Sequence, residues 1–345
     1  MDTRQKQKNK VAGKSEWFPH RFQIDDGCME MIEIDRQMIE TTTFLAAPDF
    51  PKEKTKRKRV SVEAMNSVPS PYSPPAFIFH SAFCCSTLIA RLIDLPGKVR
   101  SLKEPQVTMD IADYIRRTGT VPQHIEIIRN LIARTPITDE KTVIKPTNMA
   151  NNLLLHNTAL LAKSPILFLY GSLRGFLISV LKKGEQGRFM IRRMYSIFAN
   201  DPTRFKEIPF KQLATLTDLQ IAAMVWLLQT EMFEQKLLDC SDQLMASLDC
   251  DRFLAEPAGY LGSINEHFSL ELNEQEISQL ASSELLQLNS KDQNKNYDNE
   301  KRKLESDNIE RQYGATIDHI CQWAIGLSLH GEIKHELSRP LLPII

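Results

Sequence analysis

A short polar loop, His80-Ser81-Ala82-Phe83-Cys84-Cys85-Ser86-Thr87, stands between an apolar run and a helical pattern. The run before it, Ala76-Phe77-Ile78-Phe79, is typical of a buried strand, and apolar residues recur at helical spacing from Leu88 to Leu95 after it. Free backbone N–H groups in such a loop, together with the hydroxyls of Ser86 and Thr87, can bind a phosphate without a positive charge. The first chemistry that this sequence suggests is therefore anion binding.

The loop departs from the GxxxxGK[ST] phosphate-binding pattern, because His80 and Cys85 replace the glycines and Ser86 replaces the lysine. An ordinary buried strand-turn-helix is therefore an open alternative. His80 could hydrogen-bond a phosphate or only satisfy the end of a strand. Cys84 and Cys85 could form a reactive thiolate site, although small cysteines more often fill loops.

Two further groups with chemistry follow short apolar runs that read as strands. Glu104 comes after Val99–Leu102 and Lys145 after Thr142–Ile144, and ligands of open α/β sheets bind outside the carboxyl ends of the strands. A carboxylate there can take a proton from a reacting group, and an ammonium can stabilise a phosphate or sulfate oxygen. Lys103 could supply the cation that the loop lacks, but it alternates with Glu104, so only one of the two should face the crevice.

Short apolar runs that alternate with helical patterns predict an α/β fold with right-handed crossovers. The runs expected as adjacent strands of one mostly parallel sheet are Phe77–Phe79, Val99–Leu102, Val143–Ile144 and Ile166–Leu169. Further along, a long amphipathic helix, a last strand and a closing helix are expected at Leu216–Leu238, Leu244–Leu248 and Thr316–Leu327. Shorter helices are expected at Met109–Arg117, His124–Arg134, Asn151–Leu161 and Phe176–Lys182.

The composition limits the class of protein. The 345 residues include 43 basic and 43 acidic side chains, so the net charge is zero and supports binding neither to nucleic acid nor to a membrane surface. None of the six cysteines has metal-ligand spacing, and no stretch reads as a secretory signal or as a membrane span. We therefore expect a cytoplasmic protein with free thiols and no metal site built from its cysteines.

Three parts are expected along the chain: a disordered basic tail at residues 1–15, an extension and linker at 16–75, and the α/β domain at 76–345. The extension should form a small strand-helix unit from Phe18 to Leu45 that packs on the domain. The basic run Lys52–Arg59 could contact nucleic acid, but it lacks interleaved aromatic residues for base stacking, so a solvated linker is favoured.

Four blocks, in this order, resemble the sulfotransferase superfamily in its bacterial and Golgi-type branch: HSAFCCSTLIARLID, VIKPTNMANNLLL, PILFLYGSLRGFLISVL and LMASLDCDRFLAEPAGYLGSINEHF. The resemblance implies a three-layer α/β sandwich like that of P-loop NTPases, with a mostly parallel sheet flanked by helices. It also implies that the protein binds 3′-phosphoadenosine 5′-phosphosulfate and transfers the sulfuryl group to a hydroxyl or amine of a small acceptor.

Carried over onto this sequence, the resemblance gives Glu104 and Lys145 catalytic roles. It gives contacts with the nucleotide donor to His80, Cys84, Cys85, Ser86, Thr87, Arg174 and Ser179. The sequence departs from the family twice. The loop has Phe83-Cys84-Cys85 where a Lys or Arg usually precedes Ser-Gly-Thr, and Gly171 replaces the leading arginine of the 3′-phosphate block.

Sulfuryl transfer is the leading hypothesis, and a non-catalytic or redirected nucleotide-binding protein that acts through protein partners is the alternative. A kinase-like phosphotransferase is disfavoured, because the loop lacks a lysine and no strand ends in an obvious Asp for Mg²⁺. The segment with Lys291, Tyr297 and Arg302 could close over the nucleotide, but a solvated loop-helix is favoured. Nothing in the sequence indicates the acceptor or the oligomeric state.

Overall fold

The computed structural model describes residues 15–65, 73–134, 140–156, 159–201, 210–240, 244–286, 299–328, 331–334 and 336–342. The expected disordered tail at residues 1–15 falls almost wholly outside these ranges, as do Lys291, Tyr297 and the side chain of Arg302.

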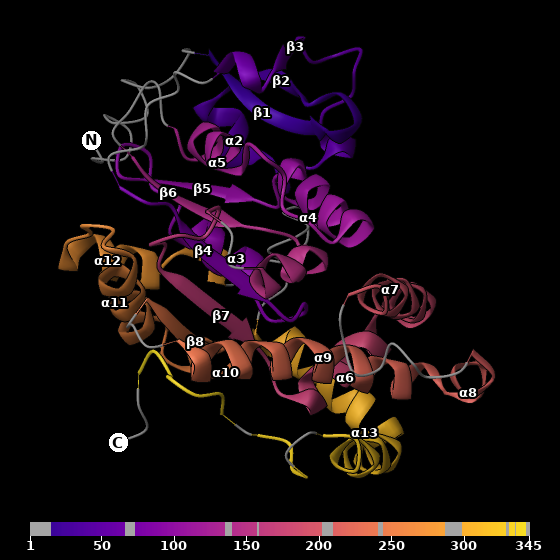
Figure 1. The fold of residues 1–345 in the computed structure, drawn as a ribbon. Coiled ribbons are helices and arrows are strands. Elements are labelled where there is room, and N and C mark those ends of the chain that lie inside the picture. The colour runs from indigo at the N-terminus through magenta and orange to yellow at the C-terminus, as the bar shows by residue number, and fades with distance from the viewer. Residues whose placement is uncertain are drawn as a thin grey trace. The chain divides into compact units, whose positions relative to one another are not determined.

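The main sheet has five strands in the order β5-β6-β4-β7-β8 (Figure 1). Their bounds are Ala76–His80 for β4, Val99–Lys103 for β5, Lys141–Lys145 for β6, Ile166–Tyr170 for β7 and Met245–Asp249 for β8. Strand β6 pairs in parallel with both β4 and β5. The prediction of an α/β fold with a mostly parallel sheet flanked by helices is confirmed. The four runs expected as strands lie in β4, β5, β6 and β7.

The strands β4, β5 and β7 are buried along their whole length. Parallel sheets are covered on both faces, and their strands therefore read as continuous apolar runs rather than as alternating patterns. The sequence Ile-Leu-Phe-Leu-Tyr of β7 is the clearest example. This burial explains the unbroken apolar runs of β4 and β7, whereas β5 is equally buried although it contains Arg100, Ser101 and Lys103.

A second sheet is antiparallel and comes from the N-terminal extension, with β1 at Ser15–Gln23, β2 at Cys28–Asp35 and β3 at Arg57–Ser61. The expected strand-helix unit is therefore three strands with helix α2 (Arg36–Thr41). The expectation of a linker at Lys52–Arg59 is wrong for its last three residues, which belong to β3. Arg57 pairs with Ile32 in the ladder and forms an ion pair with Glu30, in which both side chains are mostly buried. Lys58 and Arg59 are exposed, and charged side chains of this kind are common on edge strands.

The chain forms two compact units. Unit 1 comprises the described parts of Met1–Phe79, Thr87–Leu167 and Ala258–Ser283, and unit 2 those of His80–Ser86, Phe168–Pro257 and Glu284–Ile345. The helices of unit 1, besides α2, are α3 (Ser86–Leu92), α4 (Gln106–Thr118), α5 (Ile125–Ala133), the 3₁₀ helix Asn148–Leu155, α11 (Pro257–Phe268) and α12 (Glu274–Ala281). Those of unit 2 are α6 (Leu173–Lys182), α7 (Gly184–Phe198), α8 (Phe210–Thr215), α9 (Asp218–Asp239), α10 (Cys250–Ala255) and α13 (Asn299–Ile325).

Helix α9 is the centre of unit 2. The sequence predicts an amphipathic helix, but every residue from Ile221 to Thr230 is buried. A helix that is apolar on all sides belongs in a core, and α9 packs against α6, α7 and α13 (Figure 1). The expectation of a helix at Asn151–Leu161 is also corrected, because the structure has a 3₁₀ helix at Asn148–Leu155.

The C-terminal segment of unit 2 covers the outer edge of β8. Ser247 donates its N–H to the carbonyl of Arg339 and accepts from the N–H of Leu341, which gives a parallel bridge to Pro340. An edge strand with free N–H and C=O groups is a template for unwanted pairing, and this segment occupies those groups on Ser247.

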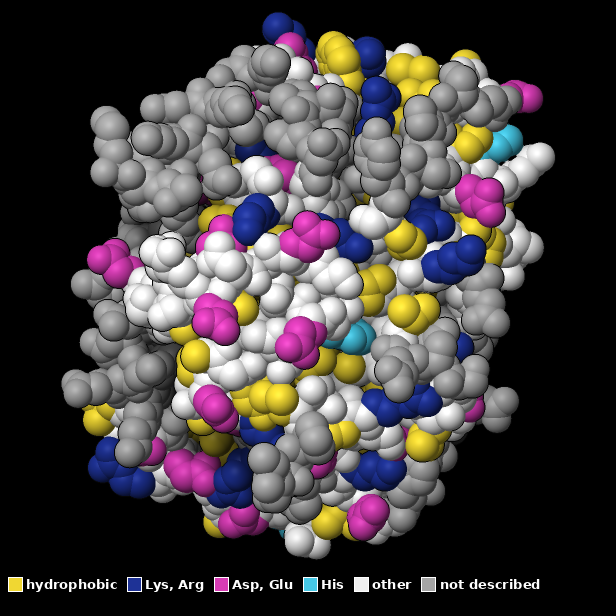
Figure 2. Space-filling view, turned by 90° about the vertical axis from the view of Figure 1, so that its left-hand side faces the viewer, with side chains coloured by type: hydrophobic (Ala, Val, Ile, Leu, Met, Phe, Trp, Pro, Cys, Tyr) yellow, Lys and Arg dark blue, Asp and Glu magenta, His cyan; other side chains and the backbone are white. Residues whose placement is uncertain are grey.

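Within the described part of the chain, no helix is both long and apolar enough to cross a membrane. Figure 2 shows one face of the molecule, on which Lys and Arg side chains are interspersed with Asp and Glu side chains among the described residues.

Candidate functional site

The loop after β4 has an unusual backbone. Ala82, Phe83 and Cys85 have φ angles of 68°, 52° and 48°, which is the left-handed region that glycine normally occupies. Ala82 and Phe83 are consecutive, and turns that contain left-handed residues can point successive N–H groups toward an anion. Each such residue costs about 1–3 kcal/mol, and strain of this kind gathers at functional sites. The loop therefore has three left-handed positions, none of which is occupied by a glycine.

Two of the predicted nucleotide ligands, His80 and Cys84, form hydrogen bonds with backbone groups of the loop and of β7. The Nδ1 atom of His80 accepts a hydrogen bond from the N–H of Ala82 at 3.2 Å, and the thiol of Cys84 donates to the carbonyl of Leu169 at 3.4 Å. Ser86 and Thr87 begin α3 and are buried. Direct contacts of these four side chains with a nucleotide stay predictions.

Two side chains of α9 donate hydrogen bonds to backbone carbonyls, one in the loop and one in the residue after β7. The side-chain amide of Gln229 donates to the carbonyl of Ser81 at 3.1 Å, and the indole N–H of Trp226 donates to the carbonyl of Gly171 at 2.8 Å. The sequence analysis did not single out Gln229. The signal was present, because Gln229 follows an unbroken apolar stretch from Ile221 to Leu228 and a buried amide must find a partner.

Cys85 of the loop lies against Cys250, the first residue of α10. The two thiols are hydrogen-bonded, and this bond together with burial raises the pKa of Cys250 well above its usual range. A Cβ atom at Gly171 would lie only 3.1 Å from the sulfur of Cys250. Gly171, where the family pattern has an arginine, thus leaves room for the thiol pair.

A cation does lie close to the loop, although not in it. The ammonium of Lys183, at the end of α6, lies 5.8 Å from the ring centre of Phe83, and that ring packs edge-on against Phe176 at 5.3 Å. Lys183 is exposed and was not singled out by the sequence, because its position near Phe83 depends on how α6 packs. It is a candidate substitute for the lysine that the loop lacks.

Arg174, for which the sequence resemblance implies a contact with the 3′-phosphate, contacts α13. Its Nε donates to Glu310 at 2.7 Å and its Nη1 to Asp318 at 2.6 Å. Ser179 lies five positions along α6, so its side chain projects about 140° from that of Arg174. The structure does not place these two side chains on one face of α6, and their joint role at a 3′-phosphate stays a prediction.

Unit 1 brings together the two predicted catalytic residues. The ammonium of Lys145 lies 2.7 Å from the carboxylate of Glu104, and the N–H of Glu104 donates to the carbonyl of Lys145. Lys145 is fully buried, whereas 21% of the Glu104 side chain is exposed. Glu104 has a φ of 53°, a strained conformation for a residue other than glycine. Of the pair, Glu104 is the group that can meet a substrate.

The N-terminal extension reaches this pair. Leu45 donates its N–H to the carbonyl of Lys103 and accepts from the N–H of Gln106, so the segment after α2 is fixed on both sides of Glu104. Phe44 places its ring 5.8 Å from the ammonium of Lys145. Partial burial and the negative charge of Glu104 raise the pKa of Asp49. Neither Phe44 nor Asp49 was expected near the candidate base.

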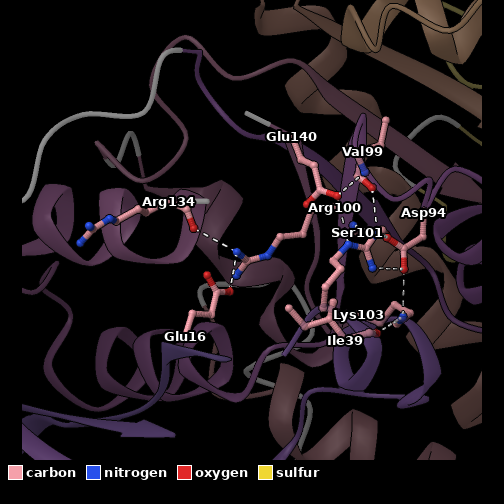
Figure 3. Close-up of polar contacts among 11 residues, drawn as sticks. Glu16, Ile39, Asp94, Val99, Arg100, Ser101, Lys103, Arg134 and Glu140 are labelled. Atoms are coloured by element: carbon pink, nitrogen blue, oxygen red, sulfur yellow. Dashed lines mark hydrogen bonds and ion pairs between the residues drawn. The ribbon is translucent and has the colours of Figure 1, made fainter. Parts of the chain in front are cut away.

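Lys103 is excluded as the missing cation of the loop. Its ammonium is fully buried and donates to the carbonyl of Ile39 in the last turn of α2 at 2.6 Å, and it lies 3.5 Å from Asp94 (Figure 3). Burial lowers the pKa of Lys103. The expected alternation is confirmed, because Lys103 pairs with Asp94 while the next residue, Glu104, pairs with Lys145. Among the described residues, no group of three or more His, Cys, Asp or Glu could hold a metal ion.

Comparisons with known proteins give one similar structure. No family model matches the sequence, and no curated protein matches it. A solved structure, the sulfotransferase domain from the curacin biosynthetic pathway, is similar with a TM-score of 0.44 and 14% sequence identity. The similarity covers 71% of this chain and 99% of that domain.

Proposed function

We propose that this protein binds 3′-phosphoadenosine 5′-phosphosulfate and transfers its sulfuryl group to a hydroxyl or amine of a small acceptor. The observation that carries the proposal is the strained loop from His80 to Ser86. Three of its residues, Ala82, Phe83 and Cys85, have the left-handed backbone that is common in anion-binding loops, and the loop directly follows a central parallel strand. The order of the four sequence blocks that resemble sulfotransferases supports the same donor.

The loop lacks a charged side chain, so the phosphosulfate has to be held largely by backbone N–H groups. Lys183 supplies the positive charge that such a dianion favours, because its ammonium lies beside the ring of Phe83. In this proposal Lys183 takes the place of the lysine that sulfotransferase loops carry.

In the proposed reaction, the acceptor oxygen or nitrogen forms a bond to the sulfur while the bond between sulfur and the phosphate oxygen breaks. The acceptor proton passes to the carboxylate of Glu104, and adenosine 3′,5′-bisphosphate leaves. Lys145 is fully buried and its ammonium lies 2.7 Å from the carboxylate, so its role in this proposal is to orient Glu104. This assigns Glu104 as the general base and Lys145 as its positioning residue.

Two measurements test the proposal. Adenosine 3′,5′-bisphosphate should raise the melting temperature of the full chain, because a ligand at 100 times its Kd stabilises the folded state by about 2.7 kcal/mol, whereas ATP and GTP should not. Lys183→Ala should reduce this shift. Lys182→Ala is the matched control, because Lys182 pairs with Glu305 instead.

The second measurement is transfer of radiolabelled sulfate from the donor into a pool of cell-extract acceptors. Glu104→Gln should lower the rate by about 10²–10⁴-fold and leave the melting shift with the bisphosphate intact. Glu126→Gln, an exposed carboxylate on α5, should leave both unchanged. Equal transfer by the wild type and Glu104→Gln would remove Glu104 from the mechanism.

The alternative is a nucleotide-binding protein without transferase activity. The ion pair between Glu104 and Lys145 favours it, because the carboxylate is already engaged by an ammonium at 2.7 Å. A melting shift with the bisphosphate and no sulfate transfer by the wild type would support this alternative. Absence of both would reject the nucleotide site.

A further inference from the structure

We propose that a segment of the N-terminal extension, residues 44–47, positions the carboxylate of Glu104, so that the extension is part of the active site. The inference rests on the proposed function, which assigns Glu104 as the general base. Glu104 follows β5, whereas this segment follows α2, and both belong to unit 1. The two stretches lie far apart in the sequence, so their contact is a product of the fold.

The backbone of the segment is hydrogen-bonded to the chain on both sides of Glu104. Leu45 donates its N–H to the carbonyl of Lys103 at 2.6 Å, and its own carbonyl accepts from the N–H of Gln106 at 3.0 Å. Ala47 then donates its N–H to the side-chain oxygen of Gln106 at 3.2 Å. Three hydrogen bonds therefore join the extension to the residues that flank Glu104.

Glu104 needs this support because its backbone is strained. Its φ of 53° lies in the left-handed region, which a residue with a side chain keeps only where the surrounding structure enforces it. One constraint is the hydrogen bond from the N–H of Glu104 to the carbonyl of Lys145 at 2.7 Å. The two hydrogen bonds of Leu45 constrain the flanking peptides. Because the backbone conformation sets the direction of the side chain, the extension helps to aim the carboxylate.

The side chain of Phe44 acts on the carboxylate through Lys145. The Lys145 ammonium is fully buried and lies 2.7 Å from the carboxylate of Glu104, and the ring centre of Phe44 lies 5.8 Å from the same ammonium. The face of an aromatic ring attracts a cation at this distance, so the ring helps to keep the ammonium where it meets the carboxylate. Phe44 is therefore a positioning residue.

The extension is itself anchored to β5 just before this segment. The buried ammonium of Lys103 donates to the carbonyls of Ile39 and Glu40 in the last turn of α2, at 2.6 and 3.3 Å (Figure 3). The residue that precedes Glu104 thus holds α2 through its side chain and Leu45 through its carbonyl. The extension is therefore a fixed support for the carboxylate.

The first experiment measures the environment of the carboxylate without using sulfate transfer. The full-length protein is treated with a water-soluble carbodiimide and glycine ethyl ester, and labelling of Glu104 is followed by peptide mass spectrometry. Phe44→Leu removes the ring, and Gln106→Met removes the hydrogen bond to Ala47, so each should speed labelling of Glu104 several-fold. Labelling of Glu126, an exposed carboxylate on α5, should not change and is the internal reference.

Two further variants complete this experiment. Phe44→Tyr keeps the ring and should be labelled at Glu104 like the wild type. Phe189→Leu makes the Phe44→Leu change at a position on α7 that is 71% exposed, and it should also behave like the wild type. Equal labelling of Glu104 in the wild type, Phe44→Leu and Gln106→Met would overturn the inference.

The second experiment measures sulfate transfer and separates this inference from the proposed function. Phe44→Leu should lower kcat by about 10–10²-fold and leave the KM for the donor and the melting shift with adenosine 3′,5′-bisphosphate unchanged. Phe44→Tyr should restore kcat. A wild-type kcat in Phe44→Leu, although Glu104 is labelled faster, would reject the positioning role. If the wild type transfers no sulfate, the proposed function fails, while faster labelling in the variants would still support the hold of the extension on Glu104.

Discussion

The two units hold ion-pair networks of opposite character. In unit 1, a buried charge network joins the extension to β5 and the turns before β5 and β6, with every side chain 8% exposed or less (Figure 3). Its members are Glu16, Arg36, Asp94, Arg100, Lys103 and Glu140. In unit 2, an Arg174 clamp consists of Arg174, Glu310 and Asp318, whose side chains are 39%, 37% and 67% exposed.

This difference in exposure indicates that the buried charge network has a structural role, whereas the Arg174 clamp can exchange its partners. A buried charge that loses its partner is left in a poorly solvated interior, which typically costs about 3–5 kcal/mol. An exposed pair contributes about 0–1 kcal/mol, because water solvates both groups when it opens. The buried charge network therefore fixes the extension to the sheet, whereas a ligand phosphate can replace the carboxylates around Arg174 at small cost.

The largest expected effect is at Asp94. Its carboxylate accepts from Arg36 at 2.6 Å and from the N–H of Ser101 at 3.0 Å, and it lies 3.5 Å from the ammonium of Lys103. Asp94→Asn keeps the shape but removes the charge that two buried cations need. The free energy of unfolding, measured with urea, should fall by about 3–5 kcal/mol.

Asp113→Asn is the control for this change. Asp113 pairs with Arg116 at 3.2 Å on α4 but is 49% exposed, so its loss should cost less than about 1 kcal/mol. If Asp94→Asn and Asp113→Asn unfold at the same urea concentration, the contrast between buried and exposed charges does not hold in this protein.

An effect of intermediate size on stability is expected at His20, a buried side chain of unit 1 that is neutral at pH 7. His20 is the extra residue at the irregularity of β1, where the pairing register shifts between Pro19 and Arg21. Among the described residues, neither of its ring nitrogens has a hydrogen-bond partner. Burial, with the charges of Arg57 and Arg21, lowers its pKa from 6.5 to about 4.

The sign of the pH dependence follows from this lowered pKa. The unfolded chain takes up a proton at His20 near pH 6.5 and the folded chain only near pH 4, so stability is lost as the pH falls through that window. Between pH 7 and pH 5 the loss should be about 2 kcal/mol in urea unfolding. His20→Leu should remove this part of the pH dependence. His319→Gln, at an exposed position on α13, should leave it in place.

Much of the fold was predictable because it depends on local pattern. The buried strands β4 and β7 are unbroken apolar runs in the sequence, and the last strand was expected at Leu244–Leu248, within one residue of β8. Strand β3 was missed because its basic residues suggest a solvated linker, and only pairing with β2 makes it a strand. The burial of α9 on all sides was missed because it depends on α6, α7 and α13 surrounding it.

The site was predictable only where topology alone brings residues together. Glu104 and Lys145 end neighbouring parallel strands, so their pairing follows from the sheet order. Three features depend on long-range packing and could not be predicted from local spacing. They are the interaction of Cys85 with Cys250, the position of Lys183 beside Phe83, and the hydrogen bond from Gln229 to Ser81.

The smallest expected effect is at the Arg174 clamp, and it tests whether the clamp gives way to a ligand. Glu310→Gln combined with Asp318→Asn should change the free energy of unfolding by less than about 1 kcal/mol per pair. If Arg174 binds the 3′-phosphate, release from its carboxylates should tighten binding of adenosine 3′,5′-bisphosphate by up to about fivefold, the equivalent of 1 kcal/mol. Calorimetric titration measures this affinity. Glu305→Gln is the control, because it changes the ion pair of Lys182 and not that of Arg174. The gain should vanish when Arg174→Met is added. Unchanged affinity in the double variant would mean that Arg174 serves only to hold α13 on α6.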